Sequence, residues 1–154
     1  MKILQYLRKT QDLGLTYGGR KCCGTEMNAY ADSDHATCRD SRRSVTGGAV
    51  ILGEGAISWF SRMQGTVAAG TTEAEYVGLS DVVQEVLFLR QMQEFMVPSL
   101  KDYPIMIRED NEGAIKLANN KHASRRTRHI DVKHHIVRDA IEKGKVRVLS
   151  LIHI

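Results

Sequence analysis

The stretch that decides the fold is Gly70-Thr71-Thr72-Glu73-Ala74-Glu75-Tyr76, which opens the longest helical pattern in the chain. Thr72 is a candidate N-cap residue, with Glu75 three positions later as its capping-box partner. Apolar residues then recur at helical spacing, which predicts a helix that packs one face on the core and continues to about Phe95. These apolar residues are Leu79, Val82, Val83, Val86, Leu87 and Leu89.

The two glutamates of this stretch are predicted to face in opposite directions. Helical residues advance by about 100° each, and Glu75 lies four positions before Leu79, so it shares the apolar face. Glu73 lies two positions earlier and faces the other side. A carboxylate directed at a core is costly unless it is paired or binds a metal. Glu75 is therefore a candidate metal ligand, and a plain capping box is the alternative interpretation.

The composition is that of one ordinary globular domain. The chain has 154 residues, of which 42% are hydrophobic and 26% are charged, which suits a single domain with a real core. No apolar run is long enough for a membrane span and no signal peptide heads the sequence, so we expect no membrane partner. The spacing of the three cysteines, Cys22, Cys23 and Cys38, is not that of a metal site. An odd number of cysteines without a secretory signal favours a reducing compartment.

Positive charge is concentrated in the last third of the chain. There are 22 Lys and Arg residues against 18 acids, a net charge of +4. Nine of the basic residues fall between Lys121 and Arg147. This region is where a polyanion would bind. Arg125, Arg126 and Arg128 suit phosphate contacts, although a solvated basic loop is an equal alternative.

The remaining elements alternate in a way that indicates an α/β domain. The three-residue run Gly53-Glu54-Gly55 between two apolar segments predicts a β-hairpin, with Trp59 as its aromatic anchor. Asp131 is a candidate N-cap and Gly144 a helix stop. We expect strands at 28–32, 46–52, 56–61, 105–107 and from Val146 onward, and further helices at 1–9, 111–118 and 131–143.

Three acids are predicted to lie where elements begin or end. Asp32 ends the first strand, Asp110 ends the fourth, and Glu75 lies in the first turn of the intervening helix. Functional sites of such sheets gather at strand ends, and hard cations such as Mg²⁺ take oxygen ligands. The three could bind two cations for attack on a phosphodiester, with Asp34 and Asn111 as neighbours. Each acid taken alone is better explained by ordinary strand-end or turn chemistry, and only the joint placement of the three favours a metal site.

The histidines form a weaker candidate for a metal site. His129, His134 and His135 lie close together in the sequence, but His134 and His135 diverge on a helix. No cysteine pair lies at zinc-finger spacing. We therefore do not expect a metal at the histidines.

Five short motifs occur in order along the chain. They are Tyr30-Ala31-Asp32-Ser33-Asp34-His35-Ala36, Ala56-Ile57-Ser58-Trp59, Thr71-Thr72-Glu73-Ala74-Glu75-Tyr76, Glu109-Asp110-Asn111 and Arg126-Thr127-Arg128-His129-Ile130-Asp131. In this order and spacing they resemble the ribonuclease H domain of Ty1/copia-type retrotransposon polyproteins. At the amino end, Ile3-Leu4-Gln5-Tyr6-Leu7 and Gly14-Leu15-Thr16-Tyr17 resemble the tail of the reverse transcriptase of the same polyproteins.

The resemblance implies both a fold and an activity. The fold is ribonuclease H-like, a mixed sheet of three antiparallel and then parallel strands flanked by helices, without the family's last helix. The activity is metal-dependent endonucleolytic cutting of the RNA strand of RNA–DNA hybrids during reverse transcription. Asp32, Glu75 and Asp110 match three of the family's four metal-binding carboxylates, which hold two Mg²⁺ ions, or Mn²⁺ in their place. Arg125, Arg126, Arg128 and Asn111 are expected to contact nucleic acid.

The implied setting is a polyprotein. Its partners are the hybrid and an upstream reverse transcriptase domain, and its location is a cytoplasmic virus-like particle or the nucleus. Because the fourth carboxylate is absent, the alternative is a catalytically inactive remnant that only binds nucleic acid. A third possibility is a structural fragment that binds nothing.

The resemblance divides the chain into three parts. Residues 1–20 correspond to the reverse transcriptase tail or linker, and 21–148 to the ribonuclease H-like domain. Residues 149–154 do not resemble the family. They can be back-translated as CTG TCT CTT ATA CAC ATC, a transposon-end adapter of sequencing libraries, so we expect them to be a non-native scar outside the fold.

Overall fold

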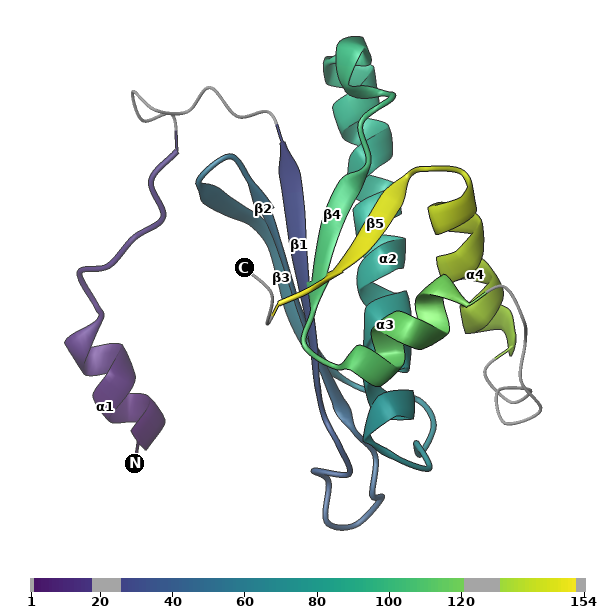
Figure 1. The fold of residues 1–154 in the computed structure, drawn as a ribbon. Helices are drawn as coiled ribbons and strands as arrows, with labels where there is room; N and C mark the ends of the chain where they lie inside the picture. The colour runs from purple at the N-terminus through teal and green to yellow at the C-terminus, as the bar shows by residue number, and fades with distance from the viewer. Residues whose placement is uncertain (1, 18–25, 121–130, 152–154) are drawn as a thin grey trace.

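The centre of the molecule is a five-stranded mixed sheet (Figure 1). A computed structural model describes residues 2–17, 26–120 and 131–151. The strand order is β3-β2-β1-β4-β5. Strands β1 (Met27–Asp34), β2 (Val45–Leu52) and β3 (Gly55–Met63) form an antiparallel meander, whereas β4 (Ile105–Glu109) and β5 (Val146–Ser150) run parallel to β1. The expected α/β class is confirmed, as is the expected mixed sheet of three antiparallel and then parallel strands with helices packed on it.

The helices that pack on the sheet lie together on one side of it, as Figure 1 shows. Helix α2 (Thr71–Met96) packs against β1 and β2, and it also contacts α3 (Glu112–Asn119) and α4 (Asp131–Glu142). The short 3₁₀ helix η1 (Pro98–Leu100) connects α2 to β4. Alternation of side chains along β1 places Met27, Ala29 and Ala31 in the core and leaves Asp32 exposed on the opposite face.

The core is built mainly by the α2 stripe that the sequence predicts. Leu79, Val82, Val83 and Val86 are fully buried. Each such side chain contributes on the order of 1.5–3 kcal/mol through removal of apolar surface from water. They pack in one cluster with residues of β1, β4, β5, α3 and α4. Helix α2 is therefore the element that the sheet and the other helices are assembled around.

The first turn of α2 differs from the predicted capping box. The helix begins at Thr71, its N-cap is Gly70, and no side chain caps it. Thr72 is therefore not the cap, and Glu75 has no capping role. Instead Glu73 reaches back, and its Oε2 accepts a hydrogen bond from the Ala69 N–H at 3.0 Å. Gly70 has extended backbone angles, and as glycine it provides no side chain to bond the free N–H groups.

Three other sequence expectations need correction or extension. Trp59 is not a buried anchor, because it lies on the open face of the sheet with 66% of its surface exposed. Its neighbour Phe60 points to the core instead. Strand β1 runs to Asp34, two residues beyond Asp32. Strand β5 continues past Val148, with Leu149 opposite Arg108 and Ser150 opposite Glu109, so the first residues of the supposed scar pair with the sheet.

Helix α1 (Lys2–Lys9) lies apart from the sheet in Figure 1 and has no buried residue. Its large apolar side chains Ile3, Leu4, Tyr6 and Leu7 are all more than half exposed. In the part of the chain that the structure describes, no helix has the length and apolar character needed to span a membrane.

Candidate metal centre

Three carboxylates from three elements converge at one end of the sheet. Asp32 lies near the carboxyl end of β1, and Asp110 directly follows β4. Because β1 and β4 are parallel neighbours, these ends meet at the same edge. Glu75 approaches from the first turns of α2. One carboxylate oxygen from each of the three acids lies within 4.8 Å of the others, and we call this group the carboxylate cluster.

A close approach of α2 to β1 brings Glu75 into reach. At Gly78, one turn after Glu75, a Cβ atom would lie only 2.3 Å from Ser33 Oγ and 3.5 Å from the Asp32 carbonyl oxygen. Any larger residue would push the helix away from the strand. The absence of a side chain at position 78 therefore sets the depth of Glu75 over the sheet.

Burial and like charge make Glu75 the most perturbed member of the carboxylate cluster. Its pKa is raised to about 7, first by burial and then by the charges of Asp110 and Asp32, with Asp34 adding a smaller effect in the same direction. Its Oε2 atom is buried and has no hydrogen-bond partner. A buried, unpaired carboxylate oxygen among other acids is stabilised by a proton or by a cation.

Glu109 is a buried acid whose position the sequence analysis did not use. It is fully buried, and its pKa is raised to about 8, first by burial and then by the charges of Glu75, Asp110 and Asp32. Its Oε1 accepts the backbone N–H of Asn111 at 3.2 Å, which opposes this rise. The alternation Ile105, Ile107, Glu109 along β4 is the signal that would have placed it inside.

Gln64 is a second residue that the sequence analysis missed. It is 2% exposed, and its Nε2 lies 3.3 Å from Ser33 Oγ, 3.0 Å from Thr46 Oγ1 and 2.8 Å from the Ala74 carbonyl oxygen. Ser33 adjoins Asp32, and Ala74 adjoins Glu75. Gln64 thus links the two backbone segments that carry these acids.

The donor set fits a divalent cation. All three groups supply carboxylate oxygens, which are the ligands that Mg²⁺ and Mn²⁺ prefer. The unpartnered Glu75 Oε2 gives one ligand atom that is already desolvated. Among the described residues, the carboxylate cluster is the group of His, Cys, Asp and Glu side chains close enough together to hold a metal ion.

The chain is similar to polyproteins of plant transposons. It is 35% identical over 149 residues to the retrovirus-related Pol polyprotein from transposon TNT 1-94 of Nicotiana tabacum, covering 97% of this chain and 11% of that protein. It is 32% identical over 150 residues to the Pol polyprotein from transposon RE2 of Arabidopsis thaliana, covering 97% and 10%. The chain therefore spans about a tenth of the length of these curated relatives. No family model matches it.

Solved structures show the same fold at low sequence identity. LC11-RNase H1, isolated from compost, superposes with a TM-score of 0.58 at 14% identity, covering 82% of this chain and 84% of that one. The complex of LC11-RNase H1 with an RNA/DNA hybrid gives 0.55 at 12% identity, covering 82% and 85%. This chain is a ribonuclease H-like relative of transposon Pol polyproteins.

The other predicted residues of this ribonuclease H-like chain have different outcomes. Asp34 ends β1 and contributes charge near Glu75. Asn111 is the N-cap of α3, and its Oδ1 accepts from the Ala114 N–H at 3.0 Å; contact with nucleic acid stays a prediction. Arg125, Arg126, Arg128 and His129 lie outside the described residues. Helix α4 begins at Asp131, as expected, and Gly144 follows it with a positive φ of 64°.

Proposed function

We propose that this chain is a metal-dependent endonuclease that hydrolyses the RNA strand of RNA–DNA hybrids during retrotransposon reverse transcription. The observation that carries the proposal is the convergence of Asp32, Glu75 and Asp110 within 4.8 Å. Relatedness to Pol polyproteins and the ribonuclease H-like fold support the choice of substrate. Ribose and phosphate contacts would then dominate over base contacts, so cutting would depend weakly on sequence.

In this proposal the three acids hold two divalent cations, of which Mg²⁺ is the first candidate and Mn²⁺ the second. Cations bound there would supply activation of the attacking water and stabilisation of the departing oxygen. The chain's own contribution is positioning. Gly78 and Gln64 hold α2 against β1, which keeps Glu75 opposite Asp32, and the register of β1 with β4 keeps Asp110 beside them. The products would carry 5′-phosphate and 3′-hydroxyl ends.

A hybrid-cleavage assay with Mg²⁺ tests the proposal. Asp110→Asn preserves size but removes a ligand charge, and it should abolish cutting while the protein stays folded. Asp102→Asn is the matched control, because Asp102 is exposed in the segment after η1 and belongs to no cluster. Binding of hybrid without cutting by the wild-type chain would instead support the inactive remnant that only holds nucleic acid.

A further proposal concerns the polyprotein partner. We infer that α1 packs against the upstream reverse transcriptase domain and does not belong to the ribonuclease H-like domain. The support is that α1 has an apolar stripe but no buried residue. An isolated helix of 8 residues is too short to be stable in water alone. Joining the natural upstream domain should protect the amide hydrogens of α1 from exchange, and unchanged exchange rates would contradict the inference.

A further inference from the structure

The turn that joins β1, the strand of Asp32, to β2 carries a group of arginines. Arg39, Arg42 and Arg43 lie in this turn, and we call them the arginine turn. All three are exposed, and none forms an ion pair with a described residue. The only acid between His35 and Ser44 is Asp40. The turn therefore presents an excess of unpaired positive charge.

The backbone of this turn is held in a defined conformation. The Arg42 N–H donates to the Cys38 carbonyl oxygen at 2.8 Å, and the Cys38 N–H donates to the Arg43 carbonyl oxygen at 3.2 Å. Ser44 closes the base, where it is fully buried and its Oγ accepts from the Ala36 N–H at 3.1 Å. A turn fixed by its own backbone presents its side chains at low entropic cost.

One of the arginines has an unfavourable backbone conformation. Arg42 has a positive φ of 54°, a region that residues other than glycine seldom occupy. Glycine would fit this position without strain. Such strain is found mostly at ligand-binding and catalytic positions. Ala36 in the same turn also has a positive φ, of 51°, so this conformation belongs to the turn as a whole.

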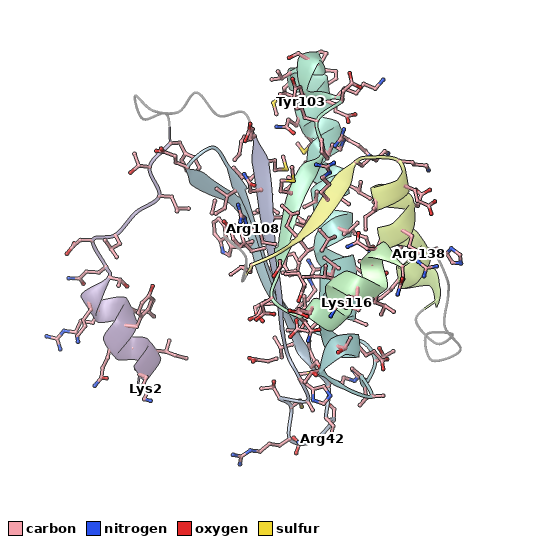
Figure 2. The ribbon with its side chains drawn as sticks, in the orientation of Figure 1. Lys2, Arg42, Tyr103, Arg108, Lys116 and Arg138 are labelled. Atoms are coloured by element: carbon pink, nitrogen blue, oxygen red, sulfur yellow. The ribbon has the colours of Figure 1, made fainter. Side chains whose placement is uncertain are left out.

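The arginine turn lies at the end of the sheet that carries the acids. Strand β1 ends at Asp34, two residues beyond Asp32, so the turn begins roughly 7 Å from Asp32 at the usual rise per residue. Figure 2 shows Arg42 at the end of the molecule where α2 begins, and Tyr103 at the opposite end. A polyanion with one phosphate at the carboxylate cluster would extend over the turn within a few nucleotides.

We propose that the arginine turn binds the sugar-phosphate backbone of the hybrid next to the carboxylate cluster. This inference rests on the proposed function, because the ligand is the substrate of that site. Guanidinium groups bind phosphate oxygens through paired hydrogen bonds. When no metal is present, repulsion between phosphates and the acids of the carboxylate cluster opposes binding, and positive charge on the arginine turn offsets this repulsion. The contacts read no base, so binding here is independent of sequence.

The salt dependence of hybrid binding in EDTA tests this proposal without any cutting. The double variant Arg42→Gln/Arg43→Gln should bind the hybrid more weakly than wild type. Its slope of log K against log salt should be less steep by about one to two. The matched control is Lys101→Gln with Lys145→Gln. It removes the same charge from two exposed lysines that precede β4 and β5, at the opposite end of these strands. Its slope should stay that of wild type.

A second variant separates binding from folding. Arg42→Gly removes both the side chain and the backbone strain, so its melting temperature should equal or exceed that of wild type while hybrid binding weakens several-fold. The inference would be overturned if the double arginine variant kept the wild-type slope of log K against log salt. It would also be overturned if the arginine and lysine double variants changed this slope equally, or if the wild-type chain did not bind hybrid. A wild type that binds in this way but never cuts with Mg²⁺ would refute the proposed function alone.

Discussion

At the scale of single residues, Glu75 gives the metal-free protein a specific dependence on pH. Burial, followed by the charges of Asp110 and Asp32, raises its pKa from 4.5 to about 7. The folded state therefore binds this proton more tightly than the unfolded state does. The resulting stabilisation is complete below about pH 4.5 and is lost as the pH rises through about 7. Glu109, with a pKa of about 8, acts in the same direction.

We therefore expect the free energy of unfolding, measured with urea in EDTA, to fall between pH 5 and pH 8, by on the order of 1–3 kcal/mol. Glu75→Gln should reduce this fall, leaving the part due to Glu109. Adding Mg²⁺ at pH 8 should restore stability, because a cation replaces the missing proton. A free energy of unfolding that rises with pH over this range would contradict the assignment.

Gln64 is expected to position the metal ligands as well as stabilise the fold. Gln64→Leu leaves the Ala74 carbonyl oxygen and two hydroxyl groups without this donor, which should cost about 1–3 kcal/mol of stability. Below its unfolding transition, the variant should also need more Mg²⁺ for half-maximal cutting. Gln93→Leu is the control, since Gln93 is buried near the other end of α2. It should lose stability without a changed Mg²⁺ requirement, and an equal change in both variants would exclude positioning.

The sequence predicts Glu75 and misses Gln64 for a physical reason. The inward direction of Glu75 follows from local helical geometry, since Leu79 and Val82 mark the buried face. The partners of Gln64 come from β1, β2 and α2, and no local period shows that such distant segments meet. Trp59 is a comparable case, because alternation places it on one face without telling which face is covered.

At the scale of elements, Arg90 joins the far end of α2 to the strands. It is 5% exposed, and its guanidinium donates to the carbonyl oxygens of Tyr103 at 2.9 Å, Lys145 at 2.7 Å and also Lys101. Its Nε pairs with Glu94 at 2.6 Å. One side chain thus satisfies the backbone of the segments that lead into β4 and β5.

Arg90→Met should therefore destabilise the protein by roughly 2–4 kcal/mol, because buried carbonyl oxygens lose their donors and Glu94 loses its partner. Urea unfolding at fixed pH measures the loss. Arg62→Met is the matched control, since Arg62 is exposed and stacks on Phe60 at 4.1 Å. Its cost should stay within about 1 kcal/mol. Similar costs for both variants would show that Arg90 contributes only through packing.

The existence and type of the elements follow from the sequence more closely than their ends do. The α2 pattern and the Gly53-Glu54-Gly55 hairpin depend on neighbouring residues, and both are present. The start of α2 depends on Gly70, which gives no side-chain signal. The carboxyl end of β5 depends on pairing with Arg108 and Glu109, which is a tertiary effect. Such an end cannot be located from residues 149–151 alone.

At the scale of the whole molecule, the order of elements limits the topology but does not fix it. An initial meander followed by crossovers indicates a mixed sheet. The central place of β1, between β2 and β4, is what brings Asp32 beside Asp110. Pairing of β1 with β4 joins residues about eighty positions apart, and no local signal reports it. The resemblance to a known family supplied that part of the prediction.

The independence of the sheet domain from α1 gives a last prediction. No residue of α1 is buried, so deleting residues 2–9 should leave the midpoint of urea unfolding unchanged. Tyr17 should be retained, because its hydroxyl donates to the Ala56 carbonyl oxygen and its ring lies against Gly55. Tyr17→Ala should cost about 1 kcal/mol by loss of this bond and contact. A midpoint lowered as much by the deletion as by Tyr17→Ala would mean that the apolar stripe of α1 folds back onto the domain, and α1 could then not be assigned to the upstream partner.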